Sequence, residues 1–568
     1  MRPLTRLLFA VALGLPAFWS QASPEPSYDL VIRNGHIIDG TGSPWYSADI
    51  AVKDGRIAAL GRLEHVDARR TVDAHGMIVA PGFIDMLDQS GHTLLVDGHA
   101  RSKIFEGVTT LITGEGESVA PLNDKILEER GAHDKPAWRT LDGYFKRLQT
   151  RGIAVNLGTY IGAATAREMV IGYGERKPTS DELEQMQAIV ARAMRAGAFG
   201  VSTALQYPPA TYSTTPELIA LAKTAAQYGG IYATHMRSEG DAEMAALDEV
   251  FEIARKAHIP AEVFHLKVAG HQNWGSMRKV IAKIDAARSE GLDISADTYA
   301  YTAWGNDLAS FIPPWAHADG TAKLLERLKN PQMRARIEKD MRTPTDSWNN
   351  DWQEVPGPHA VEITAVQNRA LKDLEGRRLD DIAKSWHENP IDALLDILIK
   401  DDAATDVAVF GMAQEDVTLA LEQPWVSICD DAAAQMPSGP LGTGNPHPRA
   451  YAAFLRIITK YVRKDHVLTL AEAIRKMTAL PAQRMGLTQR GVIKAGMWAD
   501  IDIFDPAKLR APATFEQPKQ LASGMSWVLV NGVPVIADGK MTGALPGKVL
   551  HGPGYEKRLR SLSIHSIT

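Results

Sequence analysis

Apolar runs flank glycine turns near both ends of the chain. Around Asn34-Gly35 and again around Asn531-Gly532, an apolar run stands on each side of an Asn-Gly pair, a strong short-range signal of a β-hairpin. These patterns predict two small β units, over residues 27–80 and 486–550. Units at opposite ends of a chain can pair into one β-sandwich beside a central domain.

The middle of the chain alternates short apolar runs with helical stretches such as residues 241–258. Repeated strand–helix units favour parallel pairing, and this many of them predict an α/β fold, a (β/α)8 TIM-like barrel over residues 81–485. Residues 551–568 are then a tail. The expected strands cover residues 107–113, 153–158, 198–203, 231–234, 261–264, 292–296 and 425–428.

The barrel rhythm breaks between about residues 312 and 422, where charged residues and tryptophans are frequent. We interpret this stretch as a helical insertion after a barrel strand, which would serve as a lid. The alternative is a set of helices that only buttress the barrel.

The first residues have the pattern of an export signal. Arg2 and Arg6 supply positive charge, and the apolar run after them is too short to span a bilayer comfortably. We therefore expect a signal peptide over residues 1–22 and a secreted or periplasmic protein with no membrane segment after cleavage. An uncleaved membrane anchor is the alternative, which Pro16 and the short run disfavour.

Composition narrows the function classes only a little. The 62 Lys and Arg residues and 68 Asp and Glu residues give a formal charge of -6, which argues against a nucleic-acid-binding surface. The single cysteine, Cys429, cannot form an internal disulfide, so none supports the fold.

Polar side chains that directly follow barrel strands are the candidates for chemistry, because active groups of such barrels lie at the C-terminal strand ends. His235 and His265 each end an apolar run, 30 residues apart. That spacing is about one strand–helix–strand unit, so the two histidines would occupy adjacent strand ends, and imidazole is a common metal ligand. Spacing alone leaves a metal site and two structural histidines equally favoured.

Carboxylates follow other strands. Asp430 and Asp431 follow the last expected strand, where a carboxylate could orient or deprotonate a water at a metal; a solvated acidic turn is the alternative. Asp297 follows an earlier strand. Glu115 and Glu117 lie in a glycine loop, and their pattern favours a metal ligand and an exposed acidic loop equally.

Together these motifs resemble the D-aminoacylase (N-acyl-D-amino-acid deacylase) branch of the amidohydrolase superfamily. The resemblance covers nearly the whole chain after the signal. The motifs that carry it are Tyr28-Asp29-Leu30-Val31-Ile32-Arg33-Asn34-Gly35, Ala80-Pro81-Gly82-Phe83-Ile84-Asp85, Tyr232-Ala233-Thr234-His235-Met236-Arg237-Ser238-Glu239, His265-Leu266-Lys267, His447-Pro448-Arg449, Thr478-Ala479-Leu480-Pro481-Ala482 and Gly491-Val492-Ile493.

The resemblance implies a metal barrel joined to a β-sandwich made from both chain ends, with zinc as the usual metal. By position, His235 and His265 match the zinc-binding histidines. Asp431 matches the catalytic aspartate, or Asp430 if the alignment shifts by one residue. The residues that match the family's clamp for the substrate carboxylate are Lys267, Tyr299 and Arg449.

The chain departs from the family at two places. Leu87 and Gln89 stand where the family has a His-x-His pair, and Glu115 stands in the loop that normally carries a cysteine. Leucine cannot bind zinc, whereas a carboxylate can replace a thiolate. Because the missing pair serves chiefly the weaker second metal in the family, we expect one zinc ion, held by His235, His265 and Glu115.

We therefore expect a metal-dependent enzyme that hydrolyses a linear amide bond of an N-acyl-(D-)amino acid or short peptide, with Asp431 as the general base. Its partner would be a small carboxylate-bearing substrate. The alternatives are a hydrolase of cyclic amides or lactones, and a barrel that has lost catalysis and binds a ligand. A second metal site partly rebuilt from Asp88 and His92 is a further alternative.

Overall fold

A computed structural model gives the fold and describes residues 27–129 and 136–555. The expected signal peptide, residues 1–22, and most of the expected tail lie outside this range. Within the described residues, no helix combines the length and the hydropathy needed to cross a membrane.

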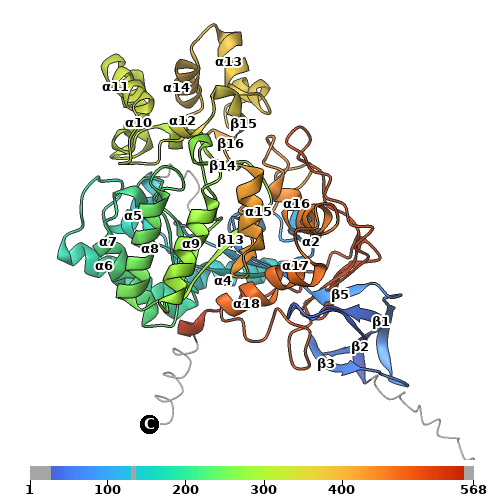
Figure 1. Ribbon diagram of the computed structural model, residues 1–568. Coiled ribbons are helices and arrows are strands. Elements are labelled where there is room, and N and C mark those ends of the chain that lie inside the picture. The colour runs from blue at the N-terminus through green and yellow to red at the C-terminus, as the bar shows by residue number, and fades with distance from the viewer. Residues whose placement is uncertain (1–26, 130–135, 556–568) are drawn as a thin grey trace, which may run out of the picture.

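A parallel barrel forms the centre of the molecule (Figure 1). Among the described residues it has eight strand positions, with β8 and β9 sharing one position on either side of Tyr160. The barrel strands are β6 (Phe83–Asp88), β7 (Val108–Thr113), β8 (Asn156–Thr159), β9 (Ile161–Gly162), β10 (Gly200–Ala204), β11 (Ile231–His235), β12 (Ala261–Val263), β13 (Ile294–Thr298) and β17 (Val426–Ile428).

The barrel closes through backbone hydrogen bonds between the end of β6 and the segment that follows β17. The Asp431 N–H donates to the Leu87 carbonyl over 3.0 Å, and the Gln89 N–H donates to the Ala432 carbonyl over 3.2 Å. This closure brings the segment after the last strand beside the segment after the first strand. Asp431 and Gln89 therefore meet at the C-terminal mouth of the barrel.

Amphipathic helices surround the strands. In α6 (Ser180–Ala196), Thr179 and Glu182 form a capping box, and Gly197 ends the helix in the left-handed conformation with φ of 110°. The other helices around the barrel are α1 (Thr93–Val96), α2 (Arg101–Ile104), α3 (Asp124–Glu129), α4 (Leu141–Arg151), α5 (Ala163–Val170), α7 (Thr215–Ala226), α8 (Glu243–Ala257), α9 (Met277–Ser289), α15 (Gln414–Glu422), α16 (Arg449–Arg456), α17 (Leu470–Met477) and α18 (Ala479–Arg484).

A separate lobe, which we call the insertion, lies between β13 and α15 and stands at the top of Figure 1. Its antiparallel sheet has the order β14 (Trp304–Asp307), β16 (Asp406–Val409), β15 (Val361–Ala365). Its helices are α10 (Thr321–Lys329), α11 (Pro331–Arg342), α12 (Asp351–Glu354), α13 (Leu379–Trp386) and α14 (Pro390–Lys400). The lobe begins earlier than the expected 312–422, and α15 is not part of it, because α15 packs on α9 and β17 of the barrel.

Both chain ends build one β domain, as the sequence predicts. Strand β5 (Ile78–Pro81) pairs with β18 (Ile501–Phe504), which joins the two ends in a nine-stranded sheet with its own apolar core. The remaining strands are β1 (Tyr28–Ile37), β2 (Tyr46–Lys53), β3 (Arg56–Gly61), β4 (Ala68–Asp73), β19 (Met525–Val530), β20 (Val533–Ala537) and β21 (Lys540–Met541).

One of the predicted hairpin turns is wrong. Asn531-Gly532 joins β19 to β20, as expected, but Asn34-Gly35 lies inside β1. There the β1–β2 register shifts between Ile32 and Gly35, and Asn34 has a left-handed φ of 55°. A bulge uses the same residue types as a tight turn, so the pattern alone did not separate the two.

Candidate active site

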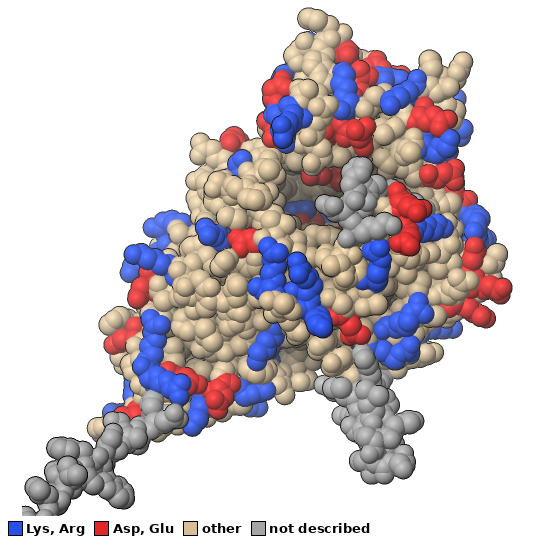
Figure 2. Space-filling view, turned by 180° about the vertical axis from the view of Figure 1, so that it is seen from behind, with Lys and Arg blue, Asp and Glu red and all other residues tan. Residues whose placement is uncertain are grey.

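A cavity of about 300 Å³ opens at the C-terminal ends of the barrel strands. Seen from behind, the molecule is hollowed between the insertion and the barrel, with charged side chains inside the hollow (Figure 2). Lining residues come from loops after several strands and from β14 of the insertion. These are Gln89, Glu115, Gln206, Tyr207, His235, Glu239, His265, Lys267, Tyr299, Trp304, Gly305, Asn306, Asp307, Asp431 and Arg449.

Two glycines bend the loop after β7 so that Glu115 faces the cavity. Gly114 and Gly116 have left-handed φ values of 100° and 61°. A side chain at Gly116 would put its Cβ 2.6 Å from the Cβ of Ala204, so the loop can approach β10 this closely only with glycine. Glu117 is exposed and does not line the cavity.

The two histidines reach the cavity from adjacent strands. His235 is the last residue of β11, and His265 lies two residues beyond β12. His265 has a left-handed φ of 36°, and its backbone N–H donates to Asp297 Oδ1 over 2.5 Å. Asp297 therefore acts on the site by holding the backbone of a cavity residue.

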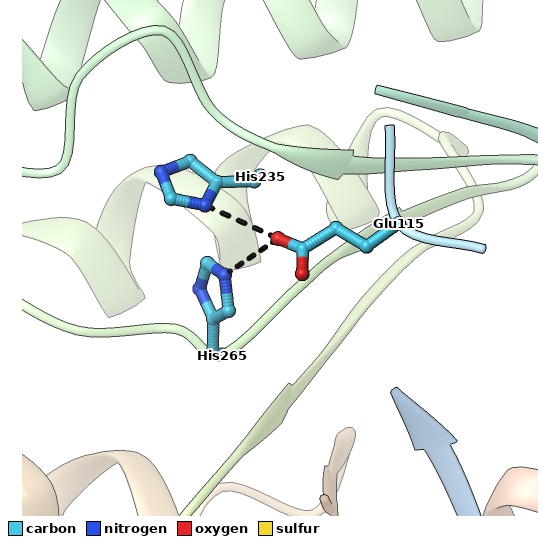
Figure 3. A group of neighbouring side chains, drawn as sticks. All are labelled: Glu115, His235 and His265. Carbon is cyan, nitrogen blue, oxygen red and sulfur yellow. Dashed lines mark hydrogen bonds and ion pairs between the residues drawn. The ribbon is translucent and has the colours of Figure 1, made fainter. Parts of the chain in front are cut away.

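Glu115, His235 and His265 converge on one point (Figure 3). Glu115 Oε1 lies 3.2 Å from His235 Nδ1 and 3.1 Å from His265 Nε2. One donor atom from each side chain lies within 4.8 Å of the others, so the three could hold a metal ion. Two imidazoles and a carboxylate are a fitting donor set for a catalytic zinc ion.

The electrostatics of this group also fit a cation. Burial acts to raise the pKa of Glu115, but its contacts with the two imidazoles outweigh burial and lower it. Burial and the ammonium of Lys267 act to lower the pKa of His265, but the carboxylates of Glu239 and Glu115 outweigh them and raise it to about 10. The carboxylates thus attract positive charge to the point where a metal ion would lie.

Glu239 and Lys267 both contact His265 at its Nδ1 nitrogen. Glu239 Oε1 lies 2.9 Å from His265 Nδ1 and 2.6 Å from Lys267 Nζ. All three side chains are buried, and the Lys267 ammonium also lies 2.7 Å from His265 Nδ1. Glu239 therefore holds the ring nitrogen of His265 that faces away from Glu115.

The other two predicted substrate-binding residues, Tyr299 and Arg449, line the same cavity. Arg449 Nη1 lies 2.9 Å from Asp431 Oδ2, and the Arg449 guanidinium stacks 4.7 Å from the centre of the Tyr299 ring. Burial raises the pKa of Tyr299, so its hydroxyl keeps its proton. That hydroxyl is buried and has no hydrogen-bond partner among the described residues, so it can donate to a ligand.

Comparison with known proteins agrees with this architecture. A family model described as "Amidohydrolase family" matches residues 70–536, and a model of the urease alpha-subunit N-terminal domain matches residues 17–83. The chain belongs to the amidohydrolase family.

The relatives of this amidohydrolase extend over nearly the whole chain. D-aminoacylase of Alcaligenes xylosoxydans xylosoxydans is 33% identical over 539 residues, which covers 94% of this chain and 99% of the relative. N-acyl-D-aspartate deacylase of the same organism is 32% identical, over 93% of this chain and 95% of the relative. These similarities place the chain in the D-aminoacylase branch, whose members hydrolyse carbon–nitrogen bonds other than peptide bonds.

Solved structures show the same similarity. The crystal structure of a D-aminoacylase has a TM-score of 0.77 and 32% identity, covering 92% of this chain and all of that one. N-acyl-D-glutamate deacylase from Bordetella bronchiseptica, solved with zinc and a phosphonate inhibitor, has a TM-score of 0.77 and 31% identity with the same coverage.

At the positions of the missing histidine pair, this amidohydrolase has different contacts. Leu87 is buried, whereas the Gln89 amide lies at the cavity mouth and donates to Glu115 Oε2 over 2.6 Å and to Asp431 Oδ1 over 3.3 Å. Gln89 therefore connects a metal-ligand candidate to the proposed base. His92 is exposed and does not line the cavity.

Asp430 is fully buried and does not line the cavity. It belongs to a second carboxylate group, made by Asp85, Asp88 and Asp430, which is fully buried. The buried ammonium of Lys103 pairs with Asp430 and lies 2.9 Å from Asp88 Oδ2. Because Asp431 lines the cavity and Asp430 does not, Asp431 is the aspartate available there.

Sequence reasoning missed three residues of the site. Glu239 is the last residue of the motif that begins at Tyr232, but no local sequence signal predicts its pairing with His265 and Lys267. Gln89 stands at a position of the missing histidine pair, but its contacts with Glu115 and Asp431 have no local signal, and nothing in the pattern distinguishes Gln206 from a surface glutamine.

Proposed function

We propose that this amidohydrolase cleaves the amide bond of N-acyl-D-amino acids by metal-assisted attack of water. The observation that carries the proposal is the arrangement of one cavity, in which a metal-ligand group, an aspartate and a carboxylate clamp face one another. The D-configuration is inferred from the names of the relatives, D-aminoacylase and the N-acyl-D-amino-acid deacylases.

Glu115, His235 and His265 would hold one zinc ion. Bound there, zinc would supply Lewis-acid activation of water and of the scissile carbonyl. Two features support a single ion: Leu87 and Gln89 replace the histidine pair, and the Lys103 ammonium already pairs with Asp88 and Asp430 of the second carboxylate group.

Asp431 would be the general base and then the general acid. Its carboxylate faces the cavity on the far side of Gln89 from Glu115. In the reaction it accepts a proton from the attacking water and returns that proton to the nitrogen of the leaving amine, so protons balance over the cycle.

Lys267, Tyr299 and Arg449 would hold the substrate carboxylate. Lys267 pairs with Glu239 and Arg449 pairs with Asp431, while the Tyr299 hydroxyl has no hydrogen-bond partner in the part of the chain that the structure describes. A substrate carboxylate would accept a hydrogen bond from the Tyr299 hydroxyl and would pair with both Lys267 and Arg449. This fixes the amide bond relative to Asp431, which is how a clamp remote from the reacting bond contributes to rate.

We also propose that the protein is exported by the signal at residues 1–22. Expression of the full chain in a bacterium, followed by mass determination of the periplasmic form, tests this: a product that begins near residue 23 is expected, and retention of an intact N-terminus in the cytoplasm would contradict it.

A substrate screen tests the proposed activity. Purified protein is analysed for metal, then assayed with matched N-acyl D- and L-amino acids, a cyclic amide and a lactone. Turnover of N-acyl-D-amino acids by zinc-loaded protein is expected. No bound zinc and no turnover after zinc is added would rule out the proposal, and preferential opening of the cyclic amide or lactone would replace the substrate class.

A further inference from the structure

A chain of hydrogen bonds runs from the insertion to one of the proposed metal ligands. Gln206 Nε2 donates to Asp351 Oδ1 over 2.9 Å, and Gln206 Oε1 lies 2.9 Å from His235 Nε2. Gln206 follows barrel strand β10, whereas Asp351 begins α12 of the insertion (Figure 1). Gln206 therefore links the insertion to one of the proposed metal ligands.

The direction of each hydrogen bond is determined by chemistry. A carboxylate only accepts, so Gln206 must turn its NH2 group toward Asp351 and its carbonyl oxygen toward His235. That oxygen also only accepts, so in the neutral ring the hydrogen resides on Nε2. His235 Nδ1, which faces Glu115, then keeps its lone pair for a metal ion.

Asp351 is itself firmly held. It is fully buried, and its Oδ1 accepts from Asn349 over 2.9 Å as well as from Gln206. Its Oδ2 accepts from Ser310 over 2.7 Å and from Asn306 over 3.1 Å. Among the residues that the structure describes, four neutral donors hold this carboxylate, and three of them, all except Gln206, belong to the insertion, so the folding of the insertion places it.

The two histidines are thus held in different ways. The distal ring nitrogen of each histidine is the one that faces away from Glu115. In His265 this nitrogen, Nδ1, lies 2.9 Å from the carboxylate of Glu239. The distal nitrogen of His235 lies 3.5 Å from Glu239 Oε2, which is longer than its 2.9 Å contact with Gln206. Glu239 is therefore the partner of His265, and Gln206 is the partner of His235.

We propose that Gln206 and Asp351 are positioning residues, which fix the tautomer and orientation of His235 so that the affinity for zinc depends on the docked insertion. The inference rests on the proposed metal site. Partners behind a ligating histidine typically change metal affinity by about 10- to 100-fold when they are removed.

Removal of the amide is the first test. Zinc affinity is measured on apo-protein by competition with a chelator, with no substrate present. Gln206→Leu should weaken zinc binding by about 10- to 100-fold. The matched control is Gln272→Leu, because Gln272 also donates to an aspartate, Asp241, over 2.8 Å but contacts no proposed ligand.

A rescue experiment separates positioning from a general structural role. Gln206→Glu alone places two carboxylates together and should weaken zinc binding. Adding Asp351→Asn restores a donor to face Glu at position 206, and that carboxylate again accepts from His235 Nε2. The double variant should therefore recover most of the wild-type affinity, although each single change lowers it.

The outcomes distinguish this inference from the proposed function. Absence of zinc from the wild-type protein would overturn both. Wild-type zinc binding with an unchanged affinity in Gln206→Leu, or no recovery in the folded double variant, would overturn only the positioning role. Circular dichroism of each variant identifies any that fail to fold, and Gln206→Leu alone then decides the question.

Discussion

The guanidinium of Arg449 lies 2.9 Å from the carboxylate of Asp431 at the mouth of the barrel. The residue proposed to hold the substrate carboxylate thus already holds the proposed base. Both side chains are buried, so water does not take the place of either charged partner when the pair opens. A substrate carboxylate would have to join this pair, which connects substrate binding directly to the position of the base.

Arg449→Met should remove discrimination in favour of carboxylate-bearing substrates. Losing a buried, charge-assisted pair costs about 2–3 kcal/mol, or roughly 30- to 150-fold in kcat/KM. The measurement compares an N-acyl amino acid with its carboxamide analogue in the wild type and the variant. Equal preference for the acid in both proteins would remove Arg449 from the clamp.

Asp431→Asn should lower kcat while zinc stays bound. Loss of a general base typically costs about 10²- to 10⁴-fold, and Asp431 is not among the three metal-ligand candidates. His265→Ala is the comparison, because it should lose zinc and activity together. Zinc per chain and kcat are measured for both, and a kcat near the wild-type value in Asp431→Asn would show that another group moves the proton.

The barrel and the histidine pair could be predicted because their signals are local. His235 and His265 follow apolar runs directly, and strand ends place them together in any such barrel. The contact of Gln206 with Asp351 joins residues 145 positions apart, and it exists only because the insertion folds back over the barrel. No sequence periodicity encodes this long-range contact, so the contact could be found only in the structure.

Restoring the histidine pair should create a second metal site. Gln89 Nε2 lies 2.6 Å from Glu115 Oε2 and 3.3 Å from Asp431 Oδ1, so a histidine there would face two carboxylates. Leu87→His with Gln89→His should raise bound zinc from one to two ions per chain, as measured by elemental analysis after equilibration with excess zinc. A ratio that stays at one would show that this position cannot complete a site.

Lys103 should be important for stability. Its buried ammonium lies 2.9 Å from Asp88 Oδ2 and 2.7 Å from the Ala432 carbonyl, and it also pairs with Asp430. Lys103→Met leaves buried carboxylates without a counterion and should lower the free energy of unfolding by about 3–5 kcal/mol. Urea unfolding checks this, with the exposed Lys384→Met, which removes the surface pair to Asp380, as the control that should change little. Equal effects of the two changes would contradict the role of Lys103 as the counterion of the buried carboxylates.

The insertion should lose stability in acid through His317. This half-buried histidine, at the end of a 3-10 turn, has its Nε2 3.1 Å from the Ala309 carbonyl, and burial with the nearby Arg327 lowers its pKa to about 4. The unfolded chain binds the proton near pH 6.5, so the stabilisation is complete above that pH and is lost as pH falls toward 4, by at most about 1.4 kcal/mol per pH unit.

A glutamine at position 317 can keep the hydrogen bond to Ala309 without titrating. His317→Gln should therefore lose less unfolding free energy than the wild type between pH 7 and pH 4.5 in urea titrations, whereas the exposed His359→Gln should behave like the wild type. Parallel pH profiles for all three proteins would show that His317 does not hold its neutral form in the fold.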